Sequence, residues 1–286
     1  MTSVTSRELE TLLQLACFHY LTAGQVEAFL FEGSALLASS RTRVTRRILA
    51  GLVRSGFVQG AQRLVDAEGV GPARRVYGLT ASGEAVLRRA GRRAGPPPVR
   101  RGSLFIEHAL MTAEVGLAFK RGTRAKPGPE LVSWESDWDL AAAIPGSPLV
   151  PDAHVVLAAD RSTLDVFLEV DRATERPAAF ARKILAYLDW YHGGGWRAHL
   201  TVWPLVLVIT TTAVRAVSLR RTTEAVLSSA GGDGTEFRFA ALGHLNEFGP
   251  FSAVWQIAGR PGLHELFDTD AIELGTGDLA AAGSRN

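Results

Sequence analysis

The feature that most constrains the fold is a set of acidic residues beside two apolar segments with strand character, His154–Ala158 and Leu164–Val170. Asp152, preceded by a proline, stands just before the first segment, and Glu169 and Asp171 stand at the end of the second. Because strand side chains alternate between faces, Glu169 and Asp171 project the same way. Carboxylates among apolar side chains are costly to bury without a cation or hydrogen-bond donors. The pattern therefore predicts a compensated acidic site, and clustered carboxylate oxygens suit Mg²⁺.

The charge of the chain is distributed unevenly along its 286 residues, although the net charge is only +2. Residues 1–103 carry 15 Arg, no Lys and 7 acidic residues, whereas residues 104–286 carry 16 basic and 22 acidic residues. This asymmetry predicts that the first third meets a polyanion, while the remainder concentrates carboxylates for another purpose. The length leaves room for one large or two ordinary domains.

Membrane and secreted classes are disfavoured by the composition. No apolar run approaches the roughly 18 residues of a membrane span, and the longest, around Val202–Ile209, contains a proline. The N-terminus lacks the basic and apolar segments of a signal peptide. The lone cysteine, Cys17, cannot form an internal disulfide. We therefore expect a cytoplasmic protein with no membrane partner.

The first third of the chain has the periodicity of helices followed by a hairpin. The expected elements are helices at 7–17, 22–30 and 40–55, a hairpin at 57–79 with a turn-rich tip at 66–72, and a helix from residue 80 to 87. This order resembles a winged helix-turn-helix, in which the third helix enters the major groove and the wing lies along phosphates. The resemblance implies contacts to double-stranded DNA by arginines on the third helix and the wing, namely Arg41, Arg43, Arg46, Arg47, Arg74 and Arg75. An arginine-rich solvated surface, or a winged helix used for protein contacts, is the alternative.

Composition also places the domain boundaries. Three consecutive prolines at 96–98, flanked by arginines, favour an extended connector. We expect a DNA-binding domain over residues 1–90, a basic proline-rich linker over 91–103, a second domain over 104–260, and a partly disordered extension over 261–286.

The second domain has the pattern of a mixed α/β fold. Helices are expected at 104–120, 177–191 and 212–229, and strands at 131–135, 154–158, 164–170, 205–210, 236–241 and 253–257. This order, with its acids, resembles the PD-(D/E)xK nuclease-like superfamily. The expected fold class is therefore α+β or α/β, with an N-terminal winged helix-turn-helix followed by a restriction-endonuclease-like mixed sheet flanked by helices.

The nuclease resemblance implies roles for individual residues. Asp152 and Glu169 match the family's magnesium ligands, whereas the position of its lysine is taken here by Asp171. Either Lys183, one helix later, supplies the ammonium, or the fold has lost its chemistry. The resemblance thus implies a Mg²⁺ site at Asp152, Glu169 and Asp171, with Lys183 neutralising charge that develops on a phosphate.

A narrower resemblance covers residues 8–225. A winged helix followed by Asp152, the segment Glu-Val-Asp-Arg-Ala-Thr-Glu at 169–175, and then Phe180, Lys183 and Tyr187 is similar to the replication-relaxation family of plasmids and integrative elements. It implies a relaxase-like, magnesium-dependent nick at a transfer or replication origin. A second copy of the chain and other replication or transfer proteins are further expected partners.

Two other functions fit the same residues. The first is a non-enzymatic winged-helix regulator whose second domain is a degenerate nuclease-like scaffold, which the acid at position 171 favours. The second is a restriction or defence nuclease that cuts both strands. Further open assignments concern Tyr187 as a nucleophile, Glu175 as a helix N-terminal acid, and Glu135 and Asp137 as additional members of the acidic cluster.

Overall fold

The computed structural model describes residues 4–64, 74–95, 102–125, 127–145, 147, 149–159, 162–231 and 236–267, with only the backbone at 61–64 and 74. The expected hairpin tip at 66–72, the prolines at 96–98 and the tail after residue 267 lie outside these residues. The chain divides into two compact units, Met1–Leu117 and Ala118–Asn286.

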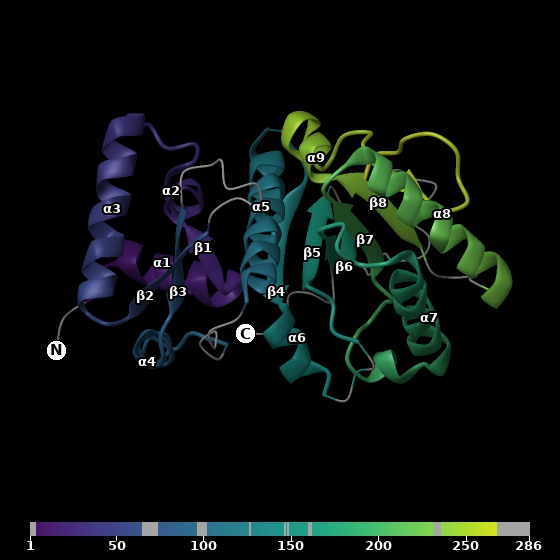
Figure 1. Ribbon diagram of the computed structural model, residues 1–286, viewed down its shortest axis with the longest axis horizontal. Helices are drawn as coiled ribbons and strands as arrows, with labels where there is room; N and C mark the ends of the chain where they lie inside the picture. The colour runs from purple at the N-terminus through teal and green to yellow at the C-terminus, as the bar shows by residue number, and fades with distance from the viewer. Residues whose placement is uncertain are drawn as a thin grey trace. The chain divides into compact units, whose positions relative to one another are not determined.

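The first unit consists of helices and a small antiparallel sheet (Figure 1). Its helices are α1 (Ser6–Phe18), α2 (Ala23–Phe31), α3 (Ala38–Arg54) and α4 (Ala81–Arg89). Strands β1 (Tyr20–Thr22), β2 (Val58–Leu64) and β3 (Arg74–Leu79) pair in the order β1-β3-β2. The helices and the hairpin lie where the sequence predicted them, whereas the three-residue β1 was not expected.

Local sequence explains where these helices begin. Thr5 and Thr22 form capping boxes with Glu8 and Gln25, so that both α1 and α2 begin with satisfied backbone donors. Packing explains the glycine in α4, since a Cβ at Gly83 would lie 2.2 Å from a backbone oxygen. Only glycine allows this close approach of α4 to the chain that enters β2.

The helix α5 (Ser103–Ala125) contains the boundary between the two units. In its first half, Ile106 and Ala109 are buried in a cluster with Tyr20 and Val76. The side-chain amide of Gln25 also donates hydrogen bonds to the carbonyl oxygen of Leu110 and to Glu114. The first compact unit therefore includes the start of α5, because apolar burial and these hydrogen bonds attach this part of the helix to it.

The second unit is built on a six-stranded mixed sheet with the order β4-β5-β6-β7-β8-β9. Its strands are β4 (Glu130–Ser136), β5 (Ala153–Ala159), β6 (Ser162–Asp171), β7 (Leu205–Thr210), β8 (Phe237–Ala241) and β9 (Gln256–Ile257). The pairs β4–β5 and β5–β6 are antiparallel, the pairs β6–β7 and β7–β8 are parallel, and β9 pairs antiparallel with β8. A mixed α/β architecture is thereby confirmed.

Helices α7 (Pro177–Gly193) and α8 (Ala213–Ala230) connect the three parallel strands. They cover one face of the sheet (Figure 1), where Phe167, Val208 and Phe239 belong to the same buried cluster as Ile184 and Leu219. α7 is capped at its C-terminal end by Gly194, whose φ of 69° suits a glycine. The short elements α6 (Asp137–Ala143), η1 (Gly195–Ala198) and α9 (Leu242–Phe248) were not expected from the sequence.

Candidate functional site

The register of the sheet brings the predicted acids to one face. Ala153, the first residue of β5, pairs with Leu168 of β6, so the antiparallel register places Asp152 opposite Glu169. Two residues further along β6, Asp171 pairs with the last residue of the parallel strand β7. Because alternate residues share a face, all three acids project toward the side covered by α7 and α8. The sequence prediction of a shared face for Glu169 and Asp171 agrees with this geometry.

Asp152 is held at the start of β5 by the backbone of β6. Its amide donates to the carbonyl oxygen of Leu168 at 2.9 Å, and its carboxylate accepts the amide of Val170 at 2.7 Å. The side chain is half-buried. This double contact fixes the position of the carboxylate relative to β6, beyond the turn role that a proline-aspartate pair often has.

Glu169 is buried between two side chains of α7. Its two carboxylate oxygens accept separate hydrogen bonds, from Lys183 Nζ at 2.7 Å and from the Tyr187 hydroxyl at 2.6 Å. Lys183 and Tyr187 are four residues apart and therefore lie on one face of the helix. The Lys183 side chain retains 35% of its exposure, whereas Glu169 retains 6%. The ammonium thus lies at the boundary between the buried carboxylate and solvent.

The ionisation of these groups is coupled. Burial raises the pKa of Glu169, the Asp152 charge adds to the rise, and Lys183 and Tyr187 act against it. Burial alone would lower the pKa of Lys183, but the charge and hydrogen bond of Glu169 raise it above its ordinary value. Burial, followed by the charge and hydrogen bond of Glu169, also raises the pKa of Tyr187. Lysine and tyrosine therefore keep their protons at neutral pH, and the tyrosine hydroxyl serves as a donor.

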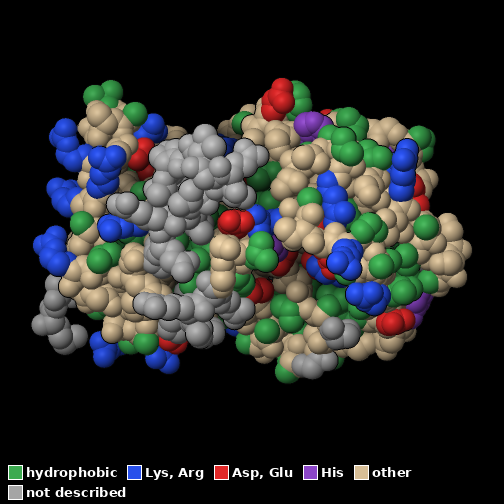
Figure 2. Space-filling view, in the orientation of Figure 1, with side chains coloured by type: hydrophobic (Ala, Val, Ile, Leu, Met, Phe, Trp, Pro, Cys, Tyr) green, Lys and Arg blue, Asp and Glu red, His purple; other side chains and the backbone are tan. Residues whose placement is uncertain are grey.

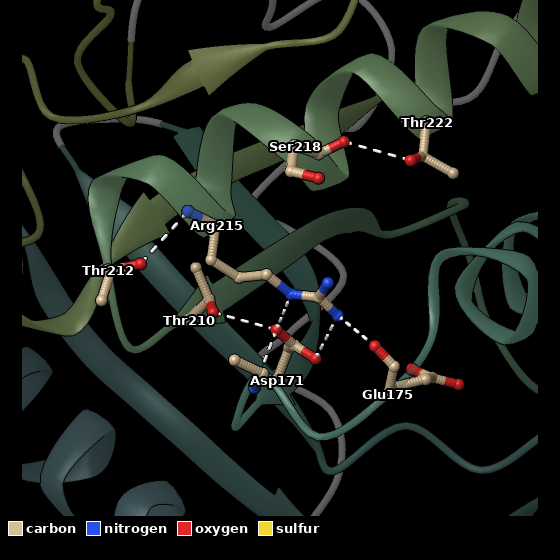
Figure 3. Close-up of polar contacts among 8 residues, drawn as sticks. Asp171, Glu175, Thr210, Thr212, Arg215, Ser218 and Thr222 are labelled. Carbon is tan, nitrogen blue, oxygen red and sulfur yellow. Dashed lines mark hydrogen bonds and ion pairs between the residues drawn. The ribbon is translucent and has the colours of Figure 1, made fainter.

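Asp171 belongs to a different contact set (Figure 3). Arg215 of α8 donates to both of its oxygens, from Nε at 2.8 Å and from Nη2 at 3.1 Å. The Thr210 hydroxyl and the Ala173 amide donate to the same carboxylate. The same Arg215 Nη2 reaches the carbonyl oxygen of Glu175 at 2.7 Å. The pKa of Arg215 is raised, chiefly by its hydrogen bond to Asp171, so the guanidinium stays charged.

Arg215 was missing from the sequence interpretation. A signal for it existed, since Thr212 caps α8 and Arg215 lies in the first turn directly after β7. A helix that follows a parallel strand begins at the same sheet edge at which the neighbouring strand ends. An arginine there can meet an acid at the end of β6, but the order of the strands must be known first.

The donor set can be compared with the predicted Mg²⁺ site. Both oxygens of Asp171 are occupied by a guanidinium, and both oxygens of Glu169 by an ammonium and a hydroxyl. Within the described part of the chain, no group of three or more His, Cys, Asp or Glu side chains is arranged to hold a metal ion. A three-carboxylate clamp does not fit this arrangement. Magnesium binding by Asp152, Glu169 and Asp171 stays a prediction, against which the contacts of Asp171 argue.

A second polar cluster lies on the same sheet face. The two ring nitrogens of His154 contact Glu135 of β4 at 3.1 Å and Asp165 of β6 at 2.9 Å. Burial alone would lower the pKa of His154, but the hydrogen bonds and charges of Asp165 and Glu135 raise it from 6.5 to about 9. Glu135, considered above as a member of the acidic cluster, instead helps to hold the three strands through a protonated histidine.

The first unit carries a basic surface on α3 (Figure 2). Arg43, Arg46 and Arg47 are exposed, and Arg41 is half-buried. The opposite face of the helix buries Ile48 and Leu49, and α3 contains no acidic residue. Arg75 of β3 is exposed, whereas the side chain of Arg74 lies outside the described atoms.

A model of the replication-relaxation family matches residues 12–206. The chain belongs to the replication-relaxation family. The resemblance drawn from the acidic segment and the preceding helices is thereby confirmed. Membership of the replication-relaxation family indicates a role in the replication or transfer of a plasmid or other mobile element. No curated protein and no solved structure matches the chain.

The family match begins within α1 and ends at the second residue of β7, and thus includes Asp152, Glu169, Asp171 and Lys183. Arg215 lies beyond it. Among the described residues of this replication-relaxation protein, no helix has the length and apolar character required to span a membrane.

Proposed function

We propose that this protein binds double-stranded DNA through its first unit and acts in the replication or transfer of a mobile element as a DNA-binding regulator. The observation that carries the proposal is the exposed, acid-free face of α3 with Arg43, Arg46 and Arg47. A helix that is anchored by an apolar stripe on one face and carries basic residues on the opposite face is suited to bind a polyanion.

The order of elements supports a winged-helix mode of binding. α2 packs against α3, and the β2–β3 hairpin follows α3 as the wing of such a module does. In this mode α3 enters the major groove, so that Arg43, Arg46 and Arg47 reach base edges and phosphates, while Arg75 contacts the backbone from the wing.

Replacing Arg43, Arg46 and Arg47 together by alanine is expected to weaken DNA binding by about 100-fold to 1000-fold. The slope of log affinity against log salt should fall in magnitude by about 3, because up to three phosphate contacts are lost. The measurement is fluorescence anisotropy of a labelled mixed-sequence duplex of about 30 base pairs at several NaCl concentrations.

The control for this experiment removes the same charge elsewhere on the first unit. Arg88, Arg89 and Arg92 are exposed on and after α4, so their triple alanine variant has the same net charge. The control should bind within about threefold of wild type. Equal losses of DNA affinity in both triple variants would show that the effect comes from net charge alone and would refute the role of α3.

The second unit is assigned, in the same proposal, to a nuclease-like scaffold whose acids are neutralised by its own cations. The ion pairs of Glu169 with Lys183 and of Asp171 with Arg215 support this assignment. Such a unit can stabilise the protein or bind a partner without cleaving DNA.

DNA nicking is the second candidate function. It is favoured by one observation, namely that Asp152, Glu169 and Lys183 act on one another electrostatically at the end of β6. A supercoiled-plasmid assay in MgCl₂ separates the candidates, with Asp152→Ala and Glu169→Ala beside wild type. The regulator predicts equal, background amounts of relaxed circles in all three. Relaxed circles formed by wild type alone would establish nicking, and linear plasmid would indicate a double-strand nuclease.

A further inference from the structure

The contacts of Asp171 and Arg215 tie the end of β6 to three other segments (Figure 3). Arg215, in the first turn of α8, binds Asp171 through two hydrogen bonds and the carbonyl oxygen of Glu175 through a third. Thr210, the last residue of β7, donates to the same carboxylate at 2.9 Å. The contacts join β6, β7, α8 and the loop that leads into α7.

The loop is shaped by the same contacts. Ala173 has a φ of 61°, which is unusual for a residue with a Cβ, and its amide donates to Asp171 Oδ2 at 3.2 Å. The loop therefore turns back onto the carboxylate immediately after β6 ends. Since α7 begins at Pro177, this turn sets the start of the helix that carries Lys183 to Glu169.

The charges at the strand ends explain why a cation is required there. Asp171 is only 7% exposed, and its neighbours on the same sheet face include Glu169, which is 4% exposed. Two buried carboxylates side by side are destabilising unless cations or donors compensate them. Lys183 compensates Glu169, and Arg215 compensates Asp171. A guanidinium stays charged at all relevant pH values and matches a carboxylate with two parallel hydrogen bonds.

We propose that Arg215 takes the place of a divalent cation at the ends of β6 and β7. It supplies the positive charge that Asp171 needs, holds the β6–α7 loop, and keeps Asp171 from acting as a metal ligand. Loss of the guanidinium frees Asp171 Oδ1 beside the Glu175 carbonyl and leaves Oδ2 with only the Thr210 and Ala173 donors, so the variant gains a site for Mg²⁺. This inference concerns the second unit and does not rest on DNA binding by the first.

The test is the thermal unfolding of Arg215→Gln and wild type, followed by tryptophan fluorescence. All six tryptophans lie between residues 134 and 255, so the signal reports on the second unit alone. Each protein is melted in about 10 mM MgCl₂ and in NaCl of equal ionic strength. We expect Arg215→Gln to melt lower than wild type in NaCl and to gain about 3 °C in MgCl₂, whereas wild type gains nothing beyond the NaCl value.

Two controls locate the effect. Arg220→Gln removes a guanidinium on the same helix that pairs with Glu224, and it should gain no magnesium response. The double variant Asp171→Asn, Arg215→Gln should lose the response, because the carboxylate is gone. A rise in the melting temperature of Arg220→Gln in MgCl₂ would assign magnesium binding to another site and overturn the proposal. The same conclusion would follow if the double variant still showed such a rise.

Wild type provides the remaining decision. If it is stabilised by MgCl₂ as much as Arg215→Gln, or if folded Arg215→Gln is not stabilised at all, Arg215 does not stand in for a cation. Should Arg215→Gln fail to fold, the wild-type experiment still decides. A magnesium-dependent rise beyond the NaCl value overturns the proposal, and no rise supports it.

Discussion

Replacing Lys183 by methionine is expected to destabilise the second unit by about 3–5 kcal/mol at pH 7, because it leaves a buried carboxylate without its cation. Glu169 would retain the Tyr187 hydroxyl, but no ammonium would oppose the charge of Asp152. Urea unfolding followed by tryptophan fluorescence measures the loss for the second unit alone.

The pH dependence distinguishes this mechanism from simple loss of packing. The pKa of Glu169 is already raised by burial, and removal of the ammonium raises it further. A group whose pKa is higher in the folded than in the unfolded state favours folding at low pH and loses this contribution as pH rises through the folded pKa. The destabilisation of Lys183→Met should therefore shrink between pH 7 and pH 5, since the carboxyl takes up a proton.

Two further variants complete the comparison. Lys183→Met combined with Glu169→Gln should recover much of the lost stability, because the uncompensated charge is removed. Arg182→Met, one position earlier and exposed, should change stability by less than about 0.5 kcal/mol. A pH-independent loss in Lys183→Met, unrelieved by Glu169→Gln, would show that the ion pair is not its cause.

The second large effect is a loss of wild-type stability in mild alkali. The pKa of His154 is raised from 6.5 in the unfolded chain to about 9 in the fold, where Glu135 and Asp165 face its two nitrogens. The contribution of protonated His154 to the free energy of unfolding is fully present below about pH 6.5 and is lost as pH rises through about 9. Because Glu135 is 40% exposed and screened, we expect a loss of about 2–3 kcal/mol.

The matched variant is His154→Gln, which keeps a donor between the two acids but does not titrate. Its unfolding free energy in urea, measured at pH 6, 7.5 and 9, should be lower than that of wild type at pH 6 and nearly flat with pH. Lys183 and Tyr187 do not interfere, since both have pKa values raised above their ordinary ones. Parallel pH profiles for the two proteins would assign the alkaline loss to other groups.

Much of the fold could be predicted because its elements have strong local signals. β7 lies at 205–210 as expected, and the alternating acids at 169 and 171 share a face. The strand β1 could not be predicted, because three residues show no periodicity and exist as a strand only by pairing with β3. The burial of Ile106 beside Tyr20 and Val76 could not be predicted either, because it depends on tertiary packing.

The sequence predicted which residues lie near the candidate site, but not which side chains contact one another there. Lys183 was expected beside the acids and does contact Glu169, because helix and strand positions were both read correctly. Asp171 was expected to share a metal with Glu169 and instead contacts Arg215. His154 was interpreted only as part of a strand, although it joins acids from both neighbouring strands.

The sequence by itself determined the elements, the basic character of α3, the common face of the acids and the family of the chain, since periodicity, charge and motif spacing are local properties. Only the tertiary structure decided which cation compensates each acid. Asp171 and Arg215 are 44 residues apart, and their contact depends on β7 lying parallel to β6 and on α8 beginning at the same sheet edge. Strand order and helix position follow from burial of the whole apolar core, which no spacing of residues along the chain specifies.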